Sequence, residues 1–530
     1  MSGPVLGGVY ELRRVYRRLG FVYSQLTMLE DYVKMILKAK VYDVARETPL
    51  DLAPELSQRL GNRVWLKRED LQPVFSYKLR GAYNLMAALT PQARERGVIC
   101  ASAGNHAQGV ALAAQKLGIK ALIVMPKTTP EIKVKAVRRL GGEIVLHGNT
   151  YDEASEHAHH LEAQKGYTYV PPYDHPLVIA GQGTVAMEIL RQHTGRLDAI
   201  FVPIGGGGLV AGVLAYVKYL APEIKVIGVE SEEAPSMARA LEAGERVRLD
   251  GIGIFADGAA VRQVGVEPFR ICQAYLDEVL LVSNDEICAA VKDTFEDTRA
   301  VPEPAGALAL AGLKQYVKRE GVKDRHLIAI FSGANVNFDR LRHIAELAEL
   351  GEHREALLGV TIPERPGSFR AFCHALGPRG ITEFNYRYAD SRQAQVFAGV
   401  QLRKGLSEKE FIINELTSHG YPVVDLSAND MAKMHIRYMV GGHGHAEHEI
   451  LYRFEFPERP GALLHFLTEM GERWNISLFH YRNHGAAYGR VLVGIQVKPA
   501  EHGEFKRFLS ELGLVHVEET QNPAYRLFLN

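Results

Sequence analysis

The chain has 530 residues, which is too long for a single hydrophobic core and predicts several domains. Lysine plus arginine and aspartate plus glutamate both number 62, so a net charge of zero argues against a nucleic-acid or membrane partner and favours a small-molecule ligand. The four cysteines lack paired ligand spacing, and no apolar run is long enough to span a bilayer. We therefore expect a cytoplasmic protein with no bound metal.

Residues 1–27 form a basic N-terminal extension with four arginines and a single acid, Glu11. This composition is compatible with an organelle transit segment. Two other interpretations stay open: a short extension of a cytosolic protein, or a start codon assigned upstream of the true one at Met28. The sequence does not decide whether residues 1–27 belong to the protein.

Short apolar runs alternate with helical patterns from Val41 to about Asn337. The runs cover 98–101, 121–125, 144–146, 199–202, 226–229 and 327–331, and helical spacing covers stretches such as 106–117 and 209–220. Continuous apolar runs are typical of strands that helices cover on both faces, so the pattern predicts parallel α/β units. Ligands of such folds bind beyond the carboxyl ends of the strands.

The first candidate site residue is Lys78, in the segment Ser76-Tyr77-Lys78-Leu79-Arg80-Gly81-Ala82. Most lysines are solvated surface groups, so this residue alone predicts little. It becomes a candidate reactive amine only in combination with the motifs that follow it.

A second motif, from Ser102 to Gly109, lies where a predicted strand meets a helix. The small residues Ser102, Ala103 and Gly104 expose main-chain donors suited to a carboxylate, and the Asn105 amide is suited to a phenolic oxygen. His106 is either a catalytic base or a group that bonds the backbone at the first turn of the helix, and both interpretations stay open.

A run of four glycines follows the predicted strand at 199–202 and opens a helix. Backbone N–H groups of Gly205, Gly206, Gly207, Gly208 and Leu209 would bind a phosphate there, helped by the helix dipole. A plain turn and a dinucleotide site with Glu230 on the ribose are the alternatives. The run lacks the third glycine of G-x-G-x-x-G, and a nucleotide leaves Lys78 without a role.

Ser332 closes the last predicted strand of the α/β region, in Phe331-Ser332-Gly333-Ala334-Asn335. Its hydroxyl can give a neutral hydrogen bond to a ring nitrogen. The simpler alternative is a serine that caps the following turn.

The sequence changes character beyond the α/β region, expected at 28–343. A charged linker helix is predicted at 344–356, and three blocks then recur in order. Thr361 to Phe369 matches Glu455 to Leu463 at an offset of 94 residues, and the blocks at 381–388 and 396–402 recur at an offset of 95. We therefore predict two α+β modules, at 357–440 and 449–530. The histidine-rich link at 441–448 is either a flexible tether or, less simply, a metal site.

A reactive lysine, a glycine phosphate site, a carboxylate loop and a terminal serine together indicate a pyridoxal-phosphate enzyme. These motifs resemble those of fold-type II pyridoxal-phosphate enzymes, and with the C-terminal repeats the chain from about Met28 onward resembles the biosynthetic threonine deaminases. That family usually has phenylalanine where this chain has Tyr77, a change that keeps an aromatic ring beside the lysine.

The resemblance implies a catalytic region of two parallel-sheet α/β subdomains followed by two ACT-like modules. It further implies that pyridoxal 5'-phosphate is attached to Lys78, that threonine or serine is deaminated, that isoleucine inhibits and valine opposes it, and that the chain forms a homotetramer. The effector sites are expected near the turns at 365–367 and 459–461. A serine racemase, a β-replacing synthase or an amino-acid sensor with an inactive catalytic half are the alternatives.

Overall fold

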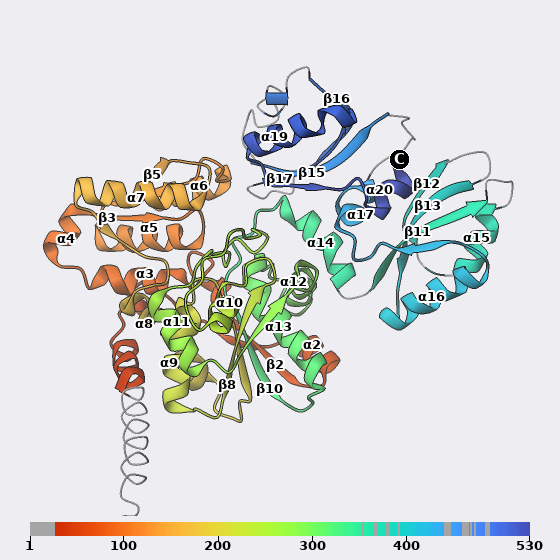
Figure 1. Ribbon diagram of the computed structural model, residues 1–530. Coiled ribbons are helices and arrows are strands. Elements are labelled where there is room, and N and C mark those ends of the chain that lie inside the picture. Colours follow the sequence, from red (N-terminus) through yellow and green to blue (C-terminus); the bar gives the residue numbers. More distant parts are fainter. Residues whose placement is uncertain are drawn as a thin grey trace, which may run out of the picture. The chain divides into compact units, whose positions relative to one another are not determined.

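The computed structural model describes residues 27–351, 354–363, 368–377, 379, 381–388, 393–438, 447–457, 466, 469–470, 473–482 and 488–529. These residues form two compact units, which divide between Val336 and Asn337. The basic extension lies outside the described residues up to position 26, and so do most of the histidine-rich link and both predicted effector turns. Figure 1 shows the elements of each unit.

The first unit contains a six-stranded sheet with the order β1-β2-β10-β7-β8-β9. Only β1 runs antiparallel to its neighbour; the other pairs are parallel. Three of the predicted apolar runs lie in β7, β8 and β10. The strands are β1 (Leu50–Leu52), β2 (Arg63–Arg68), β7 (Ala199–Pro203), β8 (Lys225–Ser231), β9 (Glu278–Val282) and β10 (His326–Phe331).

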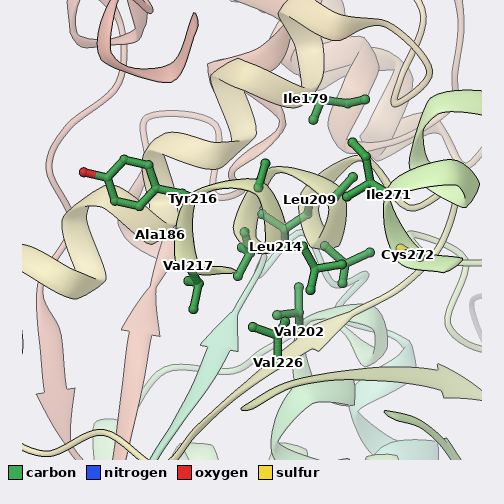
Figure 2. Close-up of a cluster of buried hydrophobic side chains, with 14 of the residues drawn as sticks. Ile179, Ala186, Val202, Leu209, Leu214, Tyr216, Val217, Val226, Ile271 and Cys272 are labelled. Carbon is green, nitrogen blue, oxygen red and sulfur yellow. The ribbon is translucent and has the colours of Figure 1, made fainter. Parts of the chain in front are cut away.

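Helices cover both faces of this sheet. Figure 2 shows Leu214 and Ile271 packed over Val202 and Val226, on the face covered by α8 (Pro176–Gln192), α9 (Gly208–Leu220) and α11 (Val266–Tyr275). Phe201 points to the opposite face, where its ring meets Tyr316 of α13 (Pro304–Glu320) at 5.5 Å between centroids. Successive strand residues alternate between faces, so burial on both sides explains why these strands are continuously apolar. Helices α2 (Pro54–Leu60), α10 (Ser236–Ala243) and α12 (Asn284–Thr298) and a helix at residues 27–37 also belong to this subdomain.

A second, four-stranded sheet of the same unit has the order β5-β4-β3-β6, and all its pairs are parallel. Its strands are β3 (Val98–Ala101), β4 (Ala121–Met125), β5 (Glu143–Leu146) and β6 (Thr168–Tyr169). The helices are α3 (Lys78–Ala87), α4 (Pro91–Arg96), α5 (Asn105–Leu117), α6 (Glu131–Arg139) and α7 (Tyr151–Lys165). Ala107, Val110 and Ile123 belong to the core on one face, and Ala154 and Val124 to the core on the other. The predicted pair of parallel-sheet subdomains is confirmed.

The second unit begins with α14 (Arg340–Gly351) and contains two antiparallel sheets with equivalent strand orders, β12-β13-β11-β14 and β16-β17-β15-β18. The register shifts at the equivalent place in both, after Ile381 and after Ile476. The two predicted α+β modules are thus confirmed. The first has β11 (Glu355–Pro363), β12 (Ile381–Tyr388), β13 (Gln393–Gln401), β14 (Val423–Asp425), α15 (Ser368–Leu376) and α16 (Leu406–Ser418); the second has β15 (Glu449–Pro457), β16 (Asn475–Arg482), β17 (Tyr488–Gln496), β18 (His516–Glu518) and α19 (His502–Leu512).

Each module is followed by a short helix, α17 (Asp430–Met434) and α20 (Pro523–Phe528). Their N-cap residues meet, since Asn429 Nδ2 donates to Asn522 Oδ1 at 3.1 Å. The ring of Phe528 packs edge-on against Phe397 of β13, with 5.6 Å between centroids. Helix α20, which follows the second module, therefore packs on the first module, so that the stability of each module depends on the other.

No helix in the described part of the chain has the length and apolar character that crossing a membrane requires. The described residues contain no group of three or more histidine, cysteine, aspartate or glutamate side chains placed to hold a metal ion.

Candidate active site

Lys78 is held against the end of β10 by main-chain contacts. Tyr77 N donates to Ser332 O at 3.3 Å, and Ser76 forms an isolated bridge with Gly333. These contacts bring Lys78, the first residue of α3, next to Ser332. Lys78 Nζ lies 5.2 Å from the centroid of the Tyr77 ring, within the range of a cation–π contact.

A fully buried ion cluster anchors α3 just beyond Lys78. The Arg80 guanidinium bonds Glu69 at 2.7 and 2.8 Å and Glu188 at 2.6 and 3.0 Å, and Lys67 Nζ lies 2.6 Å from Glu188. Burial alone would lower the pKa of Arg80, but the two carboxylates outweigh burial and raise it. Two carboxylates and two cations balance, and this neutrality makes their burial tolerable.

A cavity opens at the carboxyl ends of the strands, where the two subdomains meet. Its empty volume is about 420 Å³ when the open solvent at its mouth is included. Nine predicted site residues line it: Tyr77, Lys78, Asn105, Gly205, Gly206, Gly207, Gly208, Leu209 and Ser332. The other four predicted site residues are not among the described residues that line the cavity: Ser102, Ala103, Gly104 and His106.

The glycine run joins β7 to α9 as predicted. Gly207 is the N-cap of α9 and has φ +93°, and a Cβ there would lie 2.7 Å from Pro268 Cβ. Only glycine fits this position. The N-terminal amide groups of a 13-residue helix therefore face the cavity, where the helix dipole favours an anion.

The loop before α5 is organised by Ser102. Its Oγ accepts hydrogen bonds from Gly104 N at 3.2 Å and from Ala107 N at 3.3 Å. The space beside Gly104 is open, because a Cβ there would meet no atom within 4 Å. The open space at Gly104 is next in the chain to Asn105, which lines the cavity.

His106 bonds the backbone, which is one of the two roles that the sequence left open for it, the other being a catalytic base. Its Nε2 lies 2.8 Å from Val170 O, and because a carbonyl only accepts, Nε2 carries the proton. Burial lowers the pKa of His106 to about 3, so the ring is neutral near pH 7.

Ser332 and Glu230 bear on the rival interpretations. Ser332 Oγ lines the cavity and lies 3.3 Å from Ala305 O. The Glu230 carboxylate is buried and accepts the backbone N–H groups of Met237 and Ala238 at the start of α10, at 2.8 and 2.9 Å. That use of Glu230 argues against a ribose-binding role.

Several lining residues were not predicted from the sequence: Pro203, Tyr173, Gly258, Ala259, Glu303 and Ala305. The Tyr173 ring packs on Gly206, where a Cβ would overlap it. Nothing local in the sequence identifies Tyr173. Glu303 stands directly before Pro304, which marks the start of a helix but does not indicate that the acid faces a cavity.

The lining suits pyridoxal phosphate in its donor chemistry. Backbone amides at the start of α9 match a phosphate, Lys78 matches an aldehyde, Asn105 matches a phenolic oxygen and Ser332 matches a ring nitrogen. All four groups face one cavity, so the residues present fit the cofactor.

A family model of pyridoxal-phosphate dependent enzymes matches residues 41–333, and a model of the C-terminal regulatory domain of threonine dehydratase matches 346–436 and again 440–529. The biosynthetic L-threonine dehydratase IlvA of Burkholderia multivorans is 58% identical over 94% of this chain and 99% of its own length. The IlvA of Escherichia coli is 56% identical over 94% of this chain and 97% of its own.

Solved structures agree with these relatives. The processed form of threonine deaminase isoform 2 from Solanum lycopersicum is 51% identical, with a TM-score of 0.60 over 61% of this chain and 89% of that chain. Maize serine racemase is 30% identical, with a TM-score of 0.56 over 58% of this chain and 95% of that chain.

Proposed function

Because the chain belongs to the biosynthetic threonine dehydratase family, we propose that the cavity binds pyridoxal phosphate at Lys78 and there converts L-threonine to 2-oxobutanoate and ammonia. L-Serine would give pyruvate. The observation that carries the proposal is the meeting of Lys78, the glycine run and Ser332 in one cavity. The reaction is the first committed step of isoleucine biosynthesis.

The chain's residues divide the work of holding the cofactor. The amides of Gly205 to Leu209 bind the phosphate at the positive end of α9, and Asn105 donates to the phenolic oxygen. Ser332 would bond the ring nitrogen through a neutral hydroxyl, and Tyr77 keeps an aromatic ring beside the amine.

When bound, pyridoxal phosphate supplies an electron-withdrawing ring that stabilises negative charge at the substrate Cα. Lys78 Nζ would hold the cofactor, and as a free amine beside the bound substrate it would be placed to accept the Cα proton. The loop from Ser102 to Asn105, with His106 behind it, binds the substrate carboxylate through main-chain donors. Loss of the Cα proton and of the Cβ hydroxyl together removes one water from threonine. Hydrolysis of the resulting enamine consumes one water and gives 2-oxobutanoate and ammonia.

We propose that the second unit regulates this activity. Its two modules match the regulatory domain of threonine dehydratases, and in that family isoleucine is expected to inhibit and valine to oppose it. The turns at 365–367 and 459–461 are the proposed effector sites. A homotetramer and a cytoplasmic location are further proposals, and some relatives carry the descriptions chloroplastic or mitochondrial.

The test is an absorbance scan of the purified protein, followed by threonine addition with and without isoleucine. We expect visible absorbance from the bound cofactor, formation of 2-oxobutanoate, and inhibition that valine relieves. Racemised serine without 2-oxobutanoate would instead favour a racemase. Truncation after Leu350 should leave turnover intact and abolish the response to isoleucine, whereas a full-length enzyme that ignores isoleucine contradicts the regulatory proposal.

A further inference from the structure

The cavity holds a buried carboxylate, Glu303, to which the proposed function gives no role. Glu303 precedes α13, is 4% exposed and lines the cavity together with Asn105. The Asn105 amide Nδ2 donates a hydrogen bond to Glu303 Oε1, although 198 residues separate the two in the sequence. A buried carboxylate is costly unless it is hydrogen-bonded, so this contact stabilises both groups in place.

A second amide determines which atom of Asn105 faces Glu303. Asn335 Nδ2 donates to Val74 O at 2.8 Å and to Asn105 Oδ1 at 2.7 Å. Val74 O is a carbonyl oxygen, which only accepts, so Asn335 has to turn its NH₂ group toward it. Asn105 consequently meets Asn335 with Oδ1, and its NH₂ group faces the carboxylate of Glu303, which also accepts.

These contacts allow only one orientation of the Asn105 amide. Its Oδ1 accepts from Asn335, and one of the two Nδ2 protons goes to Glu303. The other Nδ2 proton is left for a ligand, and Asn105 lines the cavity. In this orientation Asn105 donates to a ligand through Nδ2, and an amide turned the other way would present an acceptor instead.

We propose that Glu303 and Asn335 are positioning residues that hold Asn105 as a hydrogen-bond donor to the phenolic oxygen of the cofactor. The inference rests on the proposed function, because that function supplies the ligand. A donor aimed at this oxygen stabilises its ionised form, and an acceptor aimed there would repel it. The three residues also join the subdomains, since Asn105 belongs to the smaller one and the other two to the larger one.

Gly333 provides independent geometric support. A Cβ at this position would collide with Glu303 Oε1 and lie 3.3 Å from Asn105 Nδ2. Glu303 N also donates to Gly333 O at 3.1 Å, which fixes the two segments against each other. The Glu303–Asn105 contact therefore needs glycine at 333, and even a methyl group there has to displace the carboxylate.

The first experiment compares Glu303→Met, which removes the acceptor, with Glu303→Gln, which keeps one. Two quantities are measured: the affinity of the apoenzyme for pyridoxal phosphate, and the pH at which the visible absorbance of the bound cofactor changes. We expect Glu303→Met to bind about tenfold more weakly and to move that pH upward by about one unit, the effect of one lost hydrogen bond. Glu303→Gln should stay close to the wild type in both. Glu245→Met, at an exposed glutamate, is the matched control.

A second pair of variants disturbs the orientation of the Asn105 amide through Asn335 and Gly333. Asn335→Asp cannot donate to Asn105 and sets a carboxylate against its Oδ1, so the amide is expected to lose its fixed orientation. The absorbance should then change at a higher pH, as in Glu303→Met. Gly333→Ala should act in the same direction by displacing Glu303. Its control is Gly195→Ala, because a Cβ at Gly195 meets no atom within 4 Å.

Wild-type affinity and a wild-type absorbance profile in both Glu303→Met and Asn335→Asp would overturn the inference. A lower unfolding temperature with an unchanged profile would also overturn it, because that is the signature of a purely structural role. Should Glu303→Met fail to fold, Asn335→Asp and Gly333→Ala decide. A wild type without visible absorbance or threonine turnover would instead refute the proposed function.

Discussion

Replacing Arg80 with methionine tests whether the buried ion cluster holds α3 in place. Methionine keeps an unbranched apolar stem but lacks the guanidinium, leaving Glu69 and Glu188 buried with Lys67 as their cation within the cluster. Removing one partner from a buried ion pair costs about 3–5 kcal/mol. We expect the free energy of unfolding of the first unit to fall by about that amount.

Urea unfolding followed by tryptophan fluorescence measures this cost. The chain has two tryptophans, Trp65 in β2 of the first unit and Trp474 in the second, so a Trp474→Phe background reports the first unit alone. Arg138→Met is the control, since Arg138 is exposed and 3.8 Å from Glu131. Such a surface pair contributes about 1 kcal/mol or less. A loss below about 1 kcal/mol in Arg80→Met would refute the proposed role of the cluster.

Three further changes have defined outcomes. Burial raises the pKa of Glu230 from 4.5 to about 7, so the folded protein binds a proton that the unfolded chain releases, and stability falls as pH rises through that window. Glu230→Gln should flatten this dependence in urea unfolding at about pH 5 and pH 8. Gly207→Ala forces a methyl group toward Pro268 at φ +93°, and should destabilise by about 1–3 kcal/mol and weaken cofactor binding in reconstitution titrations. Phe528→Ala removes the contact with Phe397 and should lower the stability of the second unit, followed by Trp474 fluorescence, by about 3 kcal/mol.

The strands most accessible to sequence reasoning were those that helices cover on both faces. The run at 98–101 coincides with β3 (Val98–Ala101), and the run at 121–125 coincides with β4 (Ala121–Met125). The strand β2 escaped prediction because it ends in Lys67 and Arg68. Lys67 is buried against Glu188, which a distant segment supplies, and Arg68 is buried against Asp70, two residues further on. A pattern of apolar residues cannot indicate a strand that ends in such buried charges.

The site residues likewise fall into those that a local motif predicts and those that it does not. Lys78, the glycine run and Ser332 each stand in a local motif whose chemistry is visible in the sequence. Glu303 and Tyr173 were missed because each acts through a contact with a distant segment: Glu303 with Asn105, and Tyr173 with the glycine run. Only the fold brings such groups together.

The central claim is that Lys78 carries the cofactor, and peptide mass spectrometry tests it most directly. The holoenzyme is reduced with borohydride, digested and compared with an unreduced sample, because reduction makes the link between an amine and pyridoxal phosphate permanent. We predict that the peptide containing Lys78 gains the mass of the reduced cofactor and that Lys78→Ala leaves every peptide unchanged. The added mass on any other lysine, or on none in an enzyme that still deaminates threonine, would contradict the claim.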